Sequence, residues 1–482
     1  MHQRSLFFIT SDYKLSEFLY FDLTFFCDSF ESVSPEILKE IRGYQDVADK
    51  IIDEVLNGKF KGHTYDDLAD FVDNFGNRIA GSVALENAID YLGDRMRDIG
   101  FDNVHTENVT SPKWVRGFEE AVMLKPWRKT ISVLGLAMSI STPEEGITGE
   151  VIVVQDFEDL HARVRDATNK ILVFNAPFDN PENAIKYRQR GAIEGAKINA
   201  SAVLVRSYAT YSLATPHTGL MFYDGDVQKI PAGEISIEDA ELLYRLQKKG
   251  QKPIVHIKLR SNFESDIITR NTIGDMVGTT KPHEFVLISG HADSYDVGQG
   301  ALDDGYGVIV SIKAVELLKA LKLKPKRTIR TILWTAEEVG EVPFGAAQYL
   351  EKHLEELRNN YTMFLESDSG IHNVHGLIFN GTAQAQCIMQ EVLQLLAPIN
   401  ATKLYSHFPR LKTDIVPLMQ ATGVSGALPA TDADKYFWAH HSAADTMTFL
   451  NPRDLDICLA MCSVLSYVLG DISIMLPRAV VL

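Results

Sequence analysis

Apolar side chains in the first part of the chain recur at the spacing of one helix face. In residues 34–58 they fall at Ile37, Ile41, Val47, Ile51 and Val55, and Ser34 followed by Pro35 is typical of a helix start. Similar spacing continues through residues 65–75 and 85–99, and Gly100 is a suitable stop for the last helix. We therefore expect residues 35–116 to be the helical beginning of a larger domain, preceded by an irregular N-terminal segment, residues 1–34.

The pattern changes between residues 109 and 260 to short β-like runs separated by Pro and Gly. The runs lie at 130–134, 150–154, 171–174 and 202–205, and one helical stretch lies among them at 239–247. We interpret residues 117–261 as a separate, β-rich insert.

From residue 262 onward, predicted strands and helices alternate. Strands are expected at 284–289, 328–335 and 361–366, with helices at 304–321 and 344–357 between them and a closing helix at 451–469. This order predicts an α/β fold, with a mainly parallel central sheet flanked by helices in residues 262–482. Sheets of this kind place their chemistry at the carboxyl ends of the strands.

Composition and charge narrow the class of protein. A chain of 482 residues is long enough for two or three domains, and 45% hydrophobic with 23% charged residues is typical of a soluble globular protein. The formal net charge of -17 argues against a nucleic-acid partner and against a basic membrane-binding surface. No apolar stretch is long enough to span a bilayer.

Other features bear on the cellular route. The four cysteines are too few for a disulfide-rich scaffold, and Cys458 and Cys462 are expected as buried thiols on one helix. Charged residues interrupt the apolar runs near the N-terminus, so no clear signal peptide is evident. Five glycosylation sequons favour the secretory route, and they start at Asn108, Asn199, Asn360, Asn380 and Asn400.

Candidate metal ligands follow the first predicted strand of the α/β part. The strand ends at His291, whose imidazole can bind a metal while Asp293 orients it from two residues further on. Asp303 and Asp304 come next, at the start of a predicted helix. Taken alone, this acidic pair suggests helix capping; together with His291, a bridging metal ligand is the better interpretation of Asp303.

The next predicted strand ends in two adjacent glutamates, Glu337 and Glu338. Each carboxylate would raise the pKa of the other unless a cation lies nearby. A metal resolves this conflict if Glu338 binds it and Glu337 takes a proton from water. The alternative for this pair alone is a solvent-exposed loop.

Two further donors come from later segments. Asp368 follows the third predicted strand, and His441 lies in a late loop beside His440. His441 is favoured as the ligand because Asp445, four residues on, is placed to orient it; His440 is expected to line the pocket. Five ligands of the His, Asp and Glu types suit two zinc ions about 3.5–4 Å apart. His291 and Asp368 would hold one ion, Glu338 and His441 the other, and Asp303 would bridge them.

These motifs, in this order, resemble the co-catalytic zinc aminopeptidase and glutamate carboxypeptidase family. Segments 112–117, 296–300 and 334–338 are similar to a carboxypeptidase branch of that family, and the resemblance covers about residues 41–478. It implies a catalytic α/β domain interrupted by a protease-associated insert, with two Zn²⁺ per subunit. It also implies hydrolysis of dipeptides or short peptides with free termini, a homodimer, and a secreted or lysosomal location.

The resemblance implies a role for each residue of the site. Glu337 would be the general base and Asp293 the second catalytic residue, while Asp304 and Asp445 would support the ligands without binding the ions. In relatives, the peptide bond corresponding to Asp303–Asp304 is cis. Two alternatives use the same fold: a non-catalytic receptor or binding protein, and a single-zinc glutaminyl cyclase. The complete ligand set argues against the first, and the large insert against the second.

Overall fold

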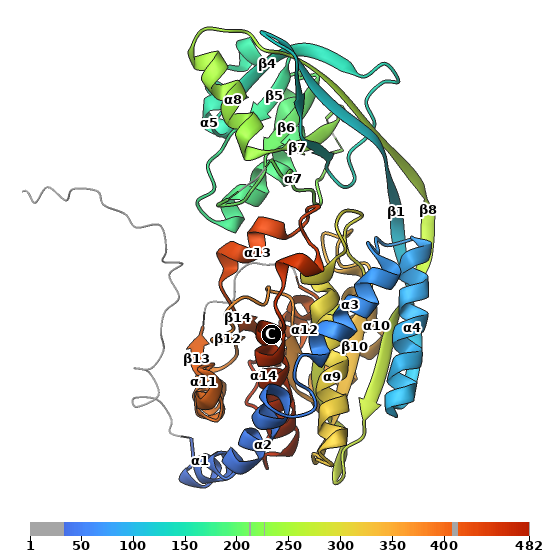
Figure 1. Cartoon of the computed structure of the whole chain (residues 1–482), viewed down its shortest axis with the longest axis vertical. Coiled ribbons are helices and arrows are strands. Elements are labelled where there is room, and N and C mark those ends of the chain that lie inside the picture. The colour runs from blue at the N-terminus through green and yellow to red at the C-terminus, as the bar shows by residue number, and fades with distance from the viewer. Residues whose placement is uncertain (1–32, 212–213, 226, 407–412, 482) are drawn as a thin grey trace, which may run out of the picture.

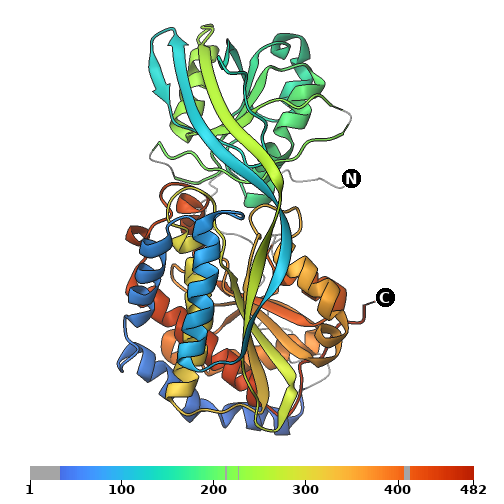
Figure 2. The same cartoon turned by 90° about the vertical axis from the view of Figure 1, so that its right-hand side faces the viewer.

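Two long antiparallel strands, β1 (Asp102–Lys125) and β8 (Ile254–Met276), join a larger lobe to a smaller one (Figures 1 and 2). The computed structural model describes residues 33–211, 214–225, 227–406 and 413–481. The predicted irregular segment, residues 1–34, therefore lies almost wholly outside the described residues. Residues 117–261, here called the insert, make up the smaller lobe together with the adjoining halves of the two long strands.

Four helices begin the larger lobe: α1 (Pro35–Arg42), α2 (Gln45–Leu56), α3 (His63–Phe75) and α4 (Val83–Ile99). The Ser34 hydroxyl accepts a hydrogen bond from the Ile37 N–H at 3.4 Å, which confirms the predicted cap. The segment expected to be continuous from 34 to 58 is divided at Gly43 and Tyr44. At the far end, Gly100 stops α4 in the left-handed conformation, with a φ of 87°.

The central sheet of the larger lobe confirms the predicted fold class. Its strands lie in the order β13 (Lys403–Tyr405), β12 (Gly376–Asn380), β14 (Ser425–Ala430), β11 (Tyr361–Glu366), β9 (Lys281–His291), β10 (Arg327–Trp334) and β8. Strands β14, β11, β9 and β10 are mutually parallel, whereas β12 and β8 run antiparallel to their neighbours β14 and β10. The parallel strands bring their carboxyl ends to one edge of the sheet.

Helices cover both faces of this sheet. On one face, α9 (Tyr306–Ala320) and α14 (Pro452–Asp471) pack against each other and against β9, with α2 and α3 outside them. On the other face lie α10 (Phe344–Asn360) and α12 (Ile415–Thr422). Cys458 and Cys462 are buried on α14, as expected. The remaining helices of this lobe are α11 (Ala383–Gln394) and α13 (Ala433–Ala439).

The insert has hydrophobic clusters of its own, and its strands extend the sheet of the larger lobe beyond β8. Strands β4 (Ile147–Val154), β5 (Ile171–Phe174), β6 (Ala202–Arg206) and β7 (Ala232–Ile235) are parallel, and β3 (Val133–Gly135) pairs with β7 antiparallel. A short β2 (Lys129–Ile131) pairs with β1. Helix α8 (Ile237–Lys248) matches the predicted helical stretch, whereas α5 (Phe157–Ala162), α6 (Val164–Ala167) and α7 (Pro181–Lys197) were not predicted.

The described part of the chain contains no helix that is both long and apolar enough to cross a membrane. Among these residues α14 is the longest α-helix, and the charged residues Asp454 and Asp456 in its first turns interrupt its run of apolar side chains.

Gly93, in the middle of α4, offers a test of helix stability. A Cβ atom added there would meet only Arg97 Nη1 at 3.5 Å, an ordinary contact. We expect Gly93→Ala to raise the free energy of unfolding by about 0.5–1 kcal/mol, because Ala loses less conformational entropy than Gly in a helix. Urea denaturation measures the change. Gly345→Ala, where the added Cβ would lie 2.5 Å from the backbone carbonyl oxygen of Thr335, should instead destabilise the protein.

Glu234, in β7, predicts a pH dependence of stability. Its two carboxylate oxygens are buried without a hydrogen-bond partner among the described residues. Burial raises the pKa of Glu234 to about 8, against the opposite effect of Arg188. The folded chain thus keeps a proton here that the unfolded chain releases near pH 4.5. The stability that protonated Glu234 contributes is therefore fully present below about pH 4.5 and is lost as the pH rises toward 8.

Glu234→Gln should therefore flatten the fall in unfolding free energy between about pH 5 and 8, a slope of at most about 1.4 kcal/mol per pH unit. Urea denaturation at a series of pH values measures it. The exposed Glu158, changed to Gln in the same way, should leave the slope unaltered. An unchanged slope in Glu234→Gln would contradict the assignment.

Candidate metal centre

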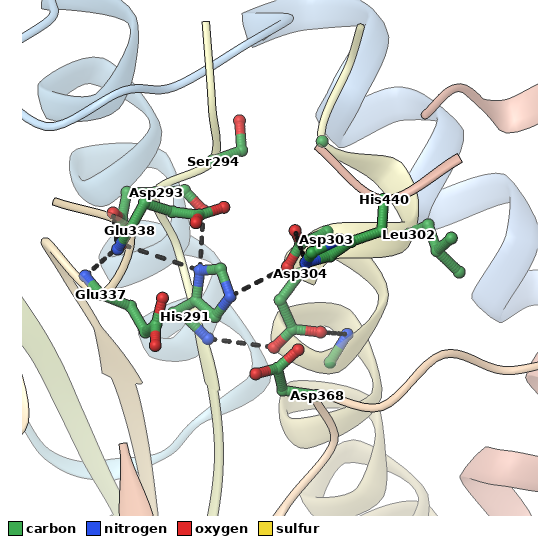
Figure 3. A network of polar contacts seen from close by, with 12 residues as sticks. His291, Asp293, Ser294, Leu302, Asp303, Asp304, Glu337, Glu338, Asp368 and His440 are labelled. Atoms are coloured by element: carbon green, nitrogen blue, oxygen red, sulfur yellow. Dashed lines mark hydrogen bonds and ion pairs between the residues drawn. The ribbon is translucent and has the colours of Figure 1, made fainter. Parts of the chain in front are cut away.

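The three predicted strand ends meet, as expected for neighbouring parallel strands. His291 is the last residue of β9, Glu337 and Glu338 follow β10, and Asp368 follows β11. Figure 3 shows these side chains turned toward one space, with Asp303 and Asp304 on its opposite side. Side chains from three strand ends and from the segment of Asp303 and Asp304 therefore line one space.

Asp303 lies at the centre of the cluster. Its Oδ1 is 3.3 Å from His291 Nε2, and its Oδ2 is 3.1 Å from His441 Nε2 and 3.5 Å from His440 Nε2. The side chain is almost fully buried. The Asp303–Asp304 peptide bond is cis, as the family resemblance implied. One carboxylate thus faces three imidazoles at distances that suit an ion held between them.

His441 faces two carboxylates at once. Its Nε2 is 3.0 Å from Glu338 Oε2 as well as 3.1 Å from Asp303 Oδ2. The other ring nitrogen, Nδ1, lies 3.3 Å from the backbone carbonyl of Thr218, in the insert. Hydrogen bonding to a carbonyl fixes the orientation of a ligating imidazole. The expectation that Asp445 plays this part is not met.

Asp445 supports Asp303 instead. Its carboxylate accepts hydrogen bonds from the backbone N–H groups of Ala301, Leu302 and Asp303, at 2.9, 2.6 and 3.2 Å. The spacing of four residues between His441 and Asp445 suggested a direct contact. His441 has a φ of 58°, however, and this left-handed turn leads the chain away before Asp445 is reached.

Asp293 connects two of the strand ends. His291 Nδ1 lies 2.9 Å from the backbone carbonyl of Asp293, so Nε2 is left to face Asp303. The Asp293 carboxylate accepts hydrogen bonds from the backbone N–H groups of Glu337 and Glu338 at 3.2 and 3.3 Å. Asp293 therefore orients the imidazole through its backbone, and its side chain holds the paired glutamates in place.

Asp304 occupies a space left by two glycines. Its carboxylate accepts hydrogen bonds from the backbone N–H of His291 at 3.1 Å and of Gly307 at 3.2 Å. A Cβ atom added at Gly290 would lie 2.6 Å from Asp304 Oδ2, and one at Gly307 would lie nearer still. Asp304 thus braces β9 against the start of α9, next to the ligand positions.

Sequence reasoning missed Arg78. This fully buried side chain donates hydrogen bonds to the backbone carbonyls of Gly76, Ala292, Gln299 and Gly300. It therefore holds the loop between His291 and Asp303. Burial lowers the pKa of Arg78 to about 10, while the surrounding carboxylates, Asp445 first, act in the opposite direction. No local motif marks Arg78, because three of its four carbonyl partners lie more than 200 residues away.

Two segments that carried the family resemblance contact each other. The Arg116 guanidinium binds both carboxylate oxygens of Asp296, each at 2.9 Å. Arg116 also donates to the Thr218 hydroxyl at 3.0 Å. This bidentate pair therefore connects β1 to the loop that follows His291 and to the insert residue that contacts His441.

Charge crowding shapes the ionisation of the site. Burial, followed by repulsion from Asp303, raises the pKa of Glu338 well above its usual value, and burial raises the pKa of Glu337 in the same direction. Burial alone would raise the pKa of Asp303 as well, but the histidines around it, His440 first, hold it well below its usual value. Burial lowers the pKa of His441 to about 4, so this imidazole is neutral and free to bind a metal.

The donor set fits divalent cations. Asp303 Oδ2 and Glu338 Oε1 are buried with no hydrogen-bond partner among the described residues. Two triads bring one donor atom from each member within 4.8 Å of the others: Asp303, His440 and His441, and His291, Asp303 and Glu338. Asp303 belongs to both, as a bridging ligand would. Imidazole and carboxylate donors without thiolate suit zinc.

Three other residues line the same space. Asp368 lies beside Asp304 in Figure 3, and the Tyr436 hydroxyl donates a hydrogen bond to Asp368 Oδ1 at 3.3 Å. Burial raises the pKa of Asp368 to about 6. His440 stacks on His441, with ring centres 3.5 Å apart. The structure therefore places every ligand predicted from the sequence around one space.

Comparison with known proteins identifies the family. The model of peptidase family M28 matches residues 271–466, which include the whole donor set. Carboxypeptidase Q of Xenopus laevis is 46% identical over 444 residues, which cover 92% of this chain and 93% of that protein. The chain belongs to peptidase family M28. It is a metallo-exopeptidase, which excludes the non-catalytic binding protein considered above.

Other relatives agree with this assignment. Human carboxypeptidase Q is 44% identical over 92% of this chain and 93% of its own length. The crystal structure of a peptidase M28 precursor from Shewanella amazonensis covers 91% of this chain and 100% of its own, with a TM-score of 0.85 and 29% identity. A zinc aminopeptidase from Bacillus subtilis shares the fold, with a TM-score of 0.63 at 20% identity over 86% of this chain and 96% of its own.

Proposed function

We propose that the chain is a di-zinc exopeptidase that hydrolyses dipeptides or short peptides with free termini. The observation that supports this most strongly is the position of Asp303 between His291 and the His440–His441 pair, shared by two donor triads. His291 and Asp368 would hold one ion and Glu338 and His441 the other, with Asp303 between them. When bound, the two ions would lower the pKa of a shared water to near neutrality.

Glu337 would act as the general base. Its backbone N–H is held by Asp293, and Figure 3 shows its carboxylate beside the His291 ring. Glu337 is less buried than its neighbour Glu338, so its carboxylate can reach both water and substrate. It would take the proton of the attacking water on a carboxylate oxygen and return it to the leaving amine. Asp293 and Arg78 would hold the loops that carry Glu337 and Asp303.

The names of the relatives support the proposed substrate class. Carboxypeptidase Q proteins of six vertebrate species match 92% of this chain at 43–46% identity. Substrates with a free terminus agree with that name. The second alternative from the sequence, a single-zinc glutaminyl cyclase, is excluded because the chain is a metallo-exopeptidase.

Metal analysis coupled to a peptide panel tests the proposal. The purified protein should contain two zinc ions per chain and should hydrolyse unblocked dipeptides. The matched controls are the same dipeptides with acetylated amino ends and amidated carboxyl ends. One zinc per chain in the active protein would contradict the proposed pair of ions. Cleavage of blocked or long peptides alone would contradict the proposed substrate class.

We also propose a secreted or lysosomal location, a homodimer, and the division into residues 1–34, 35–116, 117–261 and 262–482. Among the five candidate glycosylation sites, Asn108, Asn199, Asn380 and Asn400 are exposed and Asn360 is partly buried. Exposure is what glycan attachment requires. Treatment of the secreted protein with an amidase that removes N-linked glycans should lower its mass. We expect the glycans to be attached mainly at the four exposed asparagines.

A further inference from the structure

The start of helix α9 lies against residues 367–370, here called the Asp368 turn. A Cβ atom added at Gly307 would clash with the backbone carbonyl oxygen of Ser367, so the two segments touch through their backbones. Asp303 comes shortly before α9, and Asp368 belongs to the turn. The contact between these two segments therefore sets the separation of two proposed metal ligands.

Tyr306 connects the two segments through its hydroxyl group. It is the first residue of α9, and its side chain is fully buried. The hydroxyl donates a hydrogen bond to the Gly370 carbonyl at 2.9 Å and accepts one from the Ser369 N–H at 3.1 Å. A tyrosine hydroxyl has a single proton to donate, so these two bonds together fix the direction in which it points.

The two backbone groups that Tyr306 binds depend on it. Ser369 and Gly370 are buried, and neither the Ser369 N–H nor the Gly370 carbonyl has a second hydrogen-bond partner among the described residues. A buried backbone group that loses its partner is costly, so the chain would move until water or another group satisfied it. The Tyr306 hydroxyl therefore determines the conformation of the Asp368 turn on the side that faces α9.

Contacts with β14 and the residue after it hold the opposite side of the turn. The Ser369 hydroxyl donates to the Pro429 carbonyl at 2.7 Å, and the Thr431 hydroxyl donates to the Ser369 carbonyl at 2.8 Å. Gly370 has a φ of 80°, and a Cβ atom there would lie 2.9 Å from the Tyr436 ring. The turn is thus closely packed on the β14 side, and the Tyr306 hydroxyl connects it to the segment of Asp303.

The Asp368 carboxylate relies on this turn for its position. It accepts one hydrogen bond among the described residues, from the Tyr436 hydroxyl at 3.3 Å. A carboxylate with so little support of its own is directed by the backbone that carries it. The residues that fix this backbone therefore also fix where the Asp368 oxygens lie relative to Asp303.

We propose that Tyr306 is a positioning residue for metal binding: its hydroxyl holds Asp368 at the separation from Asp303 that suits an ion held by His291 and Asp368. This role rests on the proposed di-zinc function. The hydroxyl binds the backbone next to a ligand and does not itself bind the ion. Groups that orient a ligand in this way change metal affinity by about 10- to 100-fold, because they keep the donor atoms in place before the ion binds.

Calorimetric titration of the metal-free protein with zinc is the first test. Tyr306→Phe keeps the ring and removes only the hydroxyl. We expect one of the two zinc-binding steps to weaken by about 10- to 100-fold and the other to stay unchanged. The measurement needs no substrate, so its result does not depend on catalytic activity.

Tyr349→Phe is the matched control. Tyr349 is also buried, but it belongs to α10 on the other face of the sheet, where its hydroxyl lies 3.2 Å from the Tyr361 hydroxyl. Loss of either hydroxyl should lower the Tm of the metal-free protein, since each removal leaves a buried polar group without its partner. Tyr349→Phe should nevertheless leave both zinc-binding steps unaltered.

A second test separates positioning from general destabilisation. Asp368→Ala removes the ligand, so Tyr306 has nothing left to position in that background. Tyr306→Phe should then cause no further loss of zinc affinity, whereas two independent losses would multiply. A change that acted only on the stability of the fold would not show this dependence on Asp368.

Several results would overturn the role of Tyr306. Equal zinc titrations for Tyr306→Phe and the unaltered protein would do so, as would an equal weakening in Tyr349→Phe or a full further loss in the Asp368→Ala background. If Tyr306→Phe fails to fold, Thr431→Val loosens the same turn from the β14 side. It should weaken the same binding step, and an unchanged titration there would overturn the proposal.

The zinc number of the unaltered protein tests the proposed function separately. A single ion per chain would contradict the proposed pair of ions. If the affinity for that ion still fell in Tyr306→Phe and not in Tyr349→Phe, the role of Tyr306 would stand.

Discussion

Replacing Glu337 by Gln should leave zinc bound and lower kcat by about 10²- to 10⁴-fold, the usual contribution of a general base. Gln has the size of Glu but takes up no proton. The backbone hydrogen bonds from Glu337 and Glu338 to Asp293 hold the loop in either case, so the ligand Glu338 should keep its place. Steady-state kinetics on an unblocked dipeptide, together with zinc content per chain, measure the two effects separately.

Glu341 provides the matched control for this change. It lies four residues further along the same loop, and its side chain is exposed. Glu341→Gln should retain full activity and the same zinc content. If Glu337→Gln kept more than about a tenth of the activity, Glu337 could not be the base. If it lost zinc, Glu337 would be a ligand and the roles of the paired glutamates would need to be exchanged.

Asp303→Asn should have the largest effect on metal binding. Asp303 faces His291, His440 and His441 at distances of 3.1–3.5 Å, and it belongs to both donor triads. Removing its negative charge leaves the other ligands without their shared partner. Because changes to groups that merely support a ligand already weaken metal binding by about 10- to 100-fold, loss of a bridging ligand should exceed 100-fold.

Calorimetric titration with zinc measures the affinity, and thermal denaturation with and without zinc gives an independent reading. Zinc should raise the Tm of the unaltered protein, since a ligand that binds only the folded state stabilises it. The variant should lack this rise. Asp266→Asn, at an exposed position of β8, is the control and should behave as the unaltered protein does. A normal zinc response in Asp303→Asn would contradict its bridging role.

The fold could be predicted where one local pattern decided the structure. The strands at 171–174 and 361–366 have the predicted bounds, because short runs of buried apolar residues leave little choice. Strand β8 was not predicted as one element of 23 residues. Its middle, residues 262–266, is exposed and polar except for Phe263 in the ribbon between the lobes, so no core-facing alternation marks it. Helix α7 was missed because Gly191 and Gly195 interrupt its pattern.

Those two glycines have a structural reason that only the fold reveals. A Cβ atom at Gly195 would lie 2.6 Å from a methyl group of Val203, and one at Gly191 would lie 3.2 Å from the Phe174 ring. Helix α7 therefore packs closely on β5 and β6 where its glycines lie. A residue type that weakens a helix locally is tolerated because tertiary packing compensates.

The candidate site shows the same division between local and distant information. The positions of the five proposed ligands around one space could be predicted, because each follows a recognisable strand or lies in a family motif, and parallel strands bring their ends together. The contacts that support these side chains could not be predicted from the sequence. Thr218 orients His441 from more than 200 positions away, and Arg78 binds backbone carbonyls that any sequence would provide. The spacing of Asp445 suggested His441 as its partner. Because of the left-handed turn at His441, its carboxylate binds the backbone of residues 301–303 instead.

The ribbon of β1 and β8 also limits how lobes could be exchanged between relatives. Its two strands are paired from Asp102 with Asp275 to Lys125 with Ile254. The register shifts at four places, between Asp102 and His105, Ser111 and Lys113, Arg116 and Glu119, and Met123 and Lys125. Side chains alternate between faces along a strand, so a splice displaced by one residue would turn every following side chain over. A working chimera would therefore need both crossover points placed at paired positions, within one stretch of unbroken register.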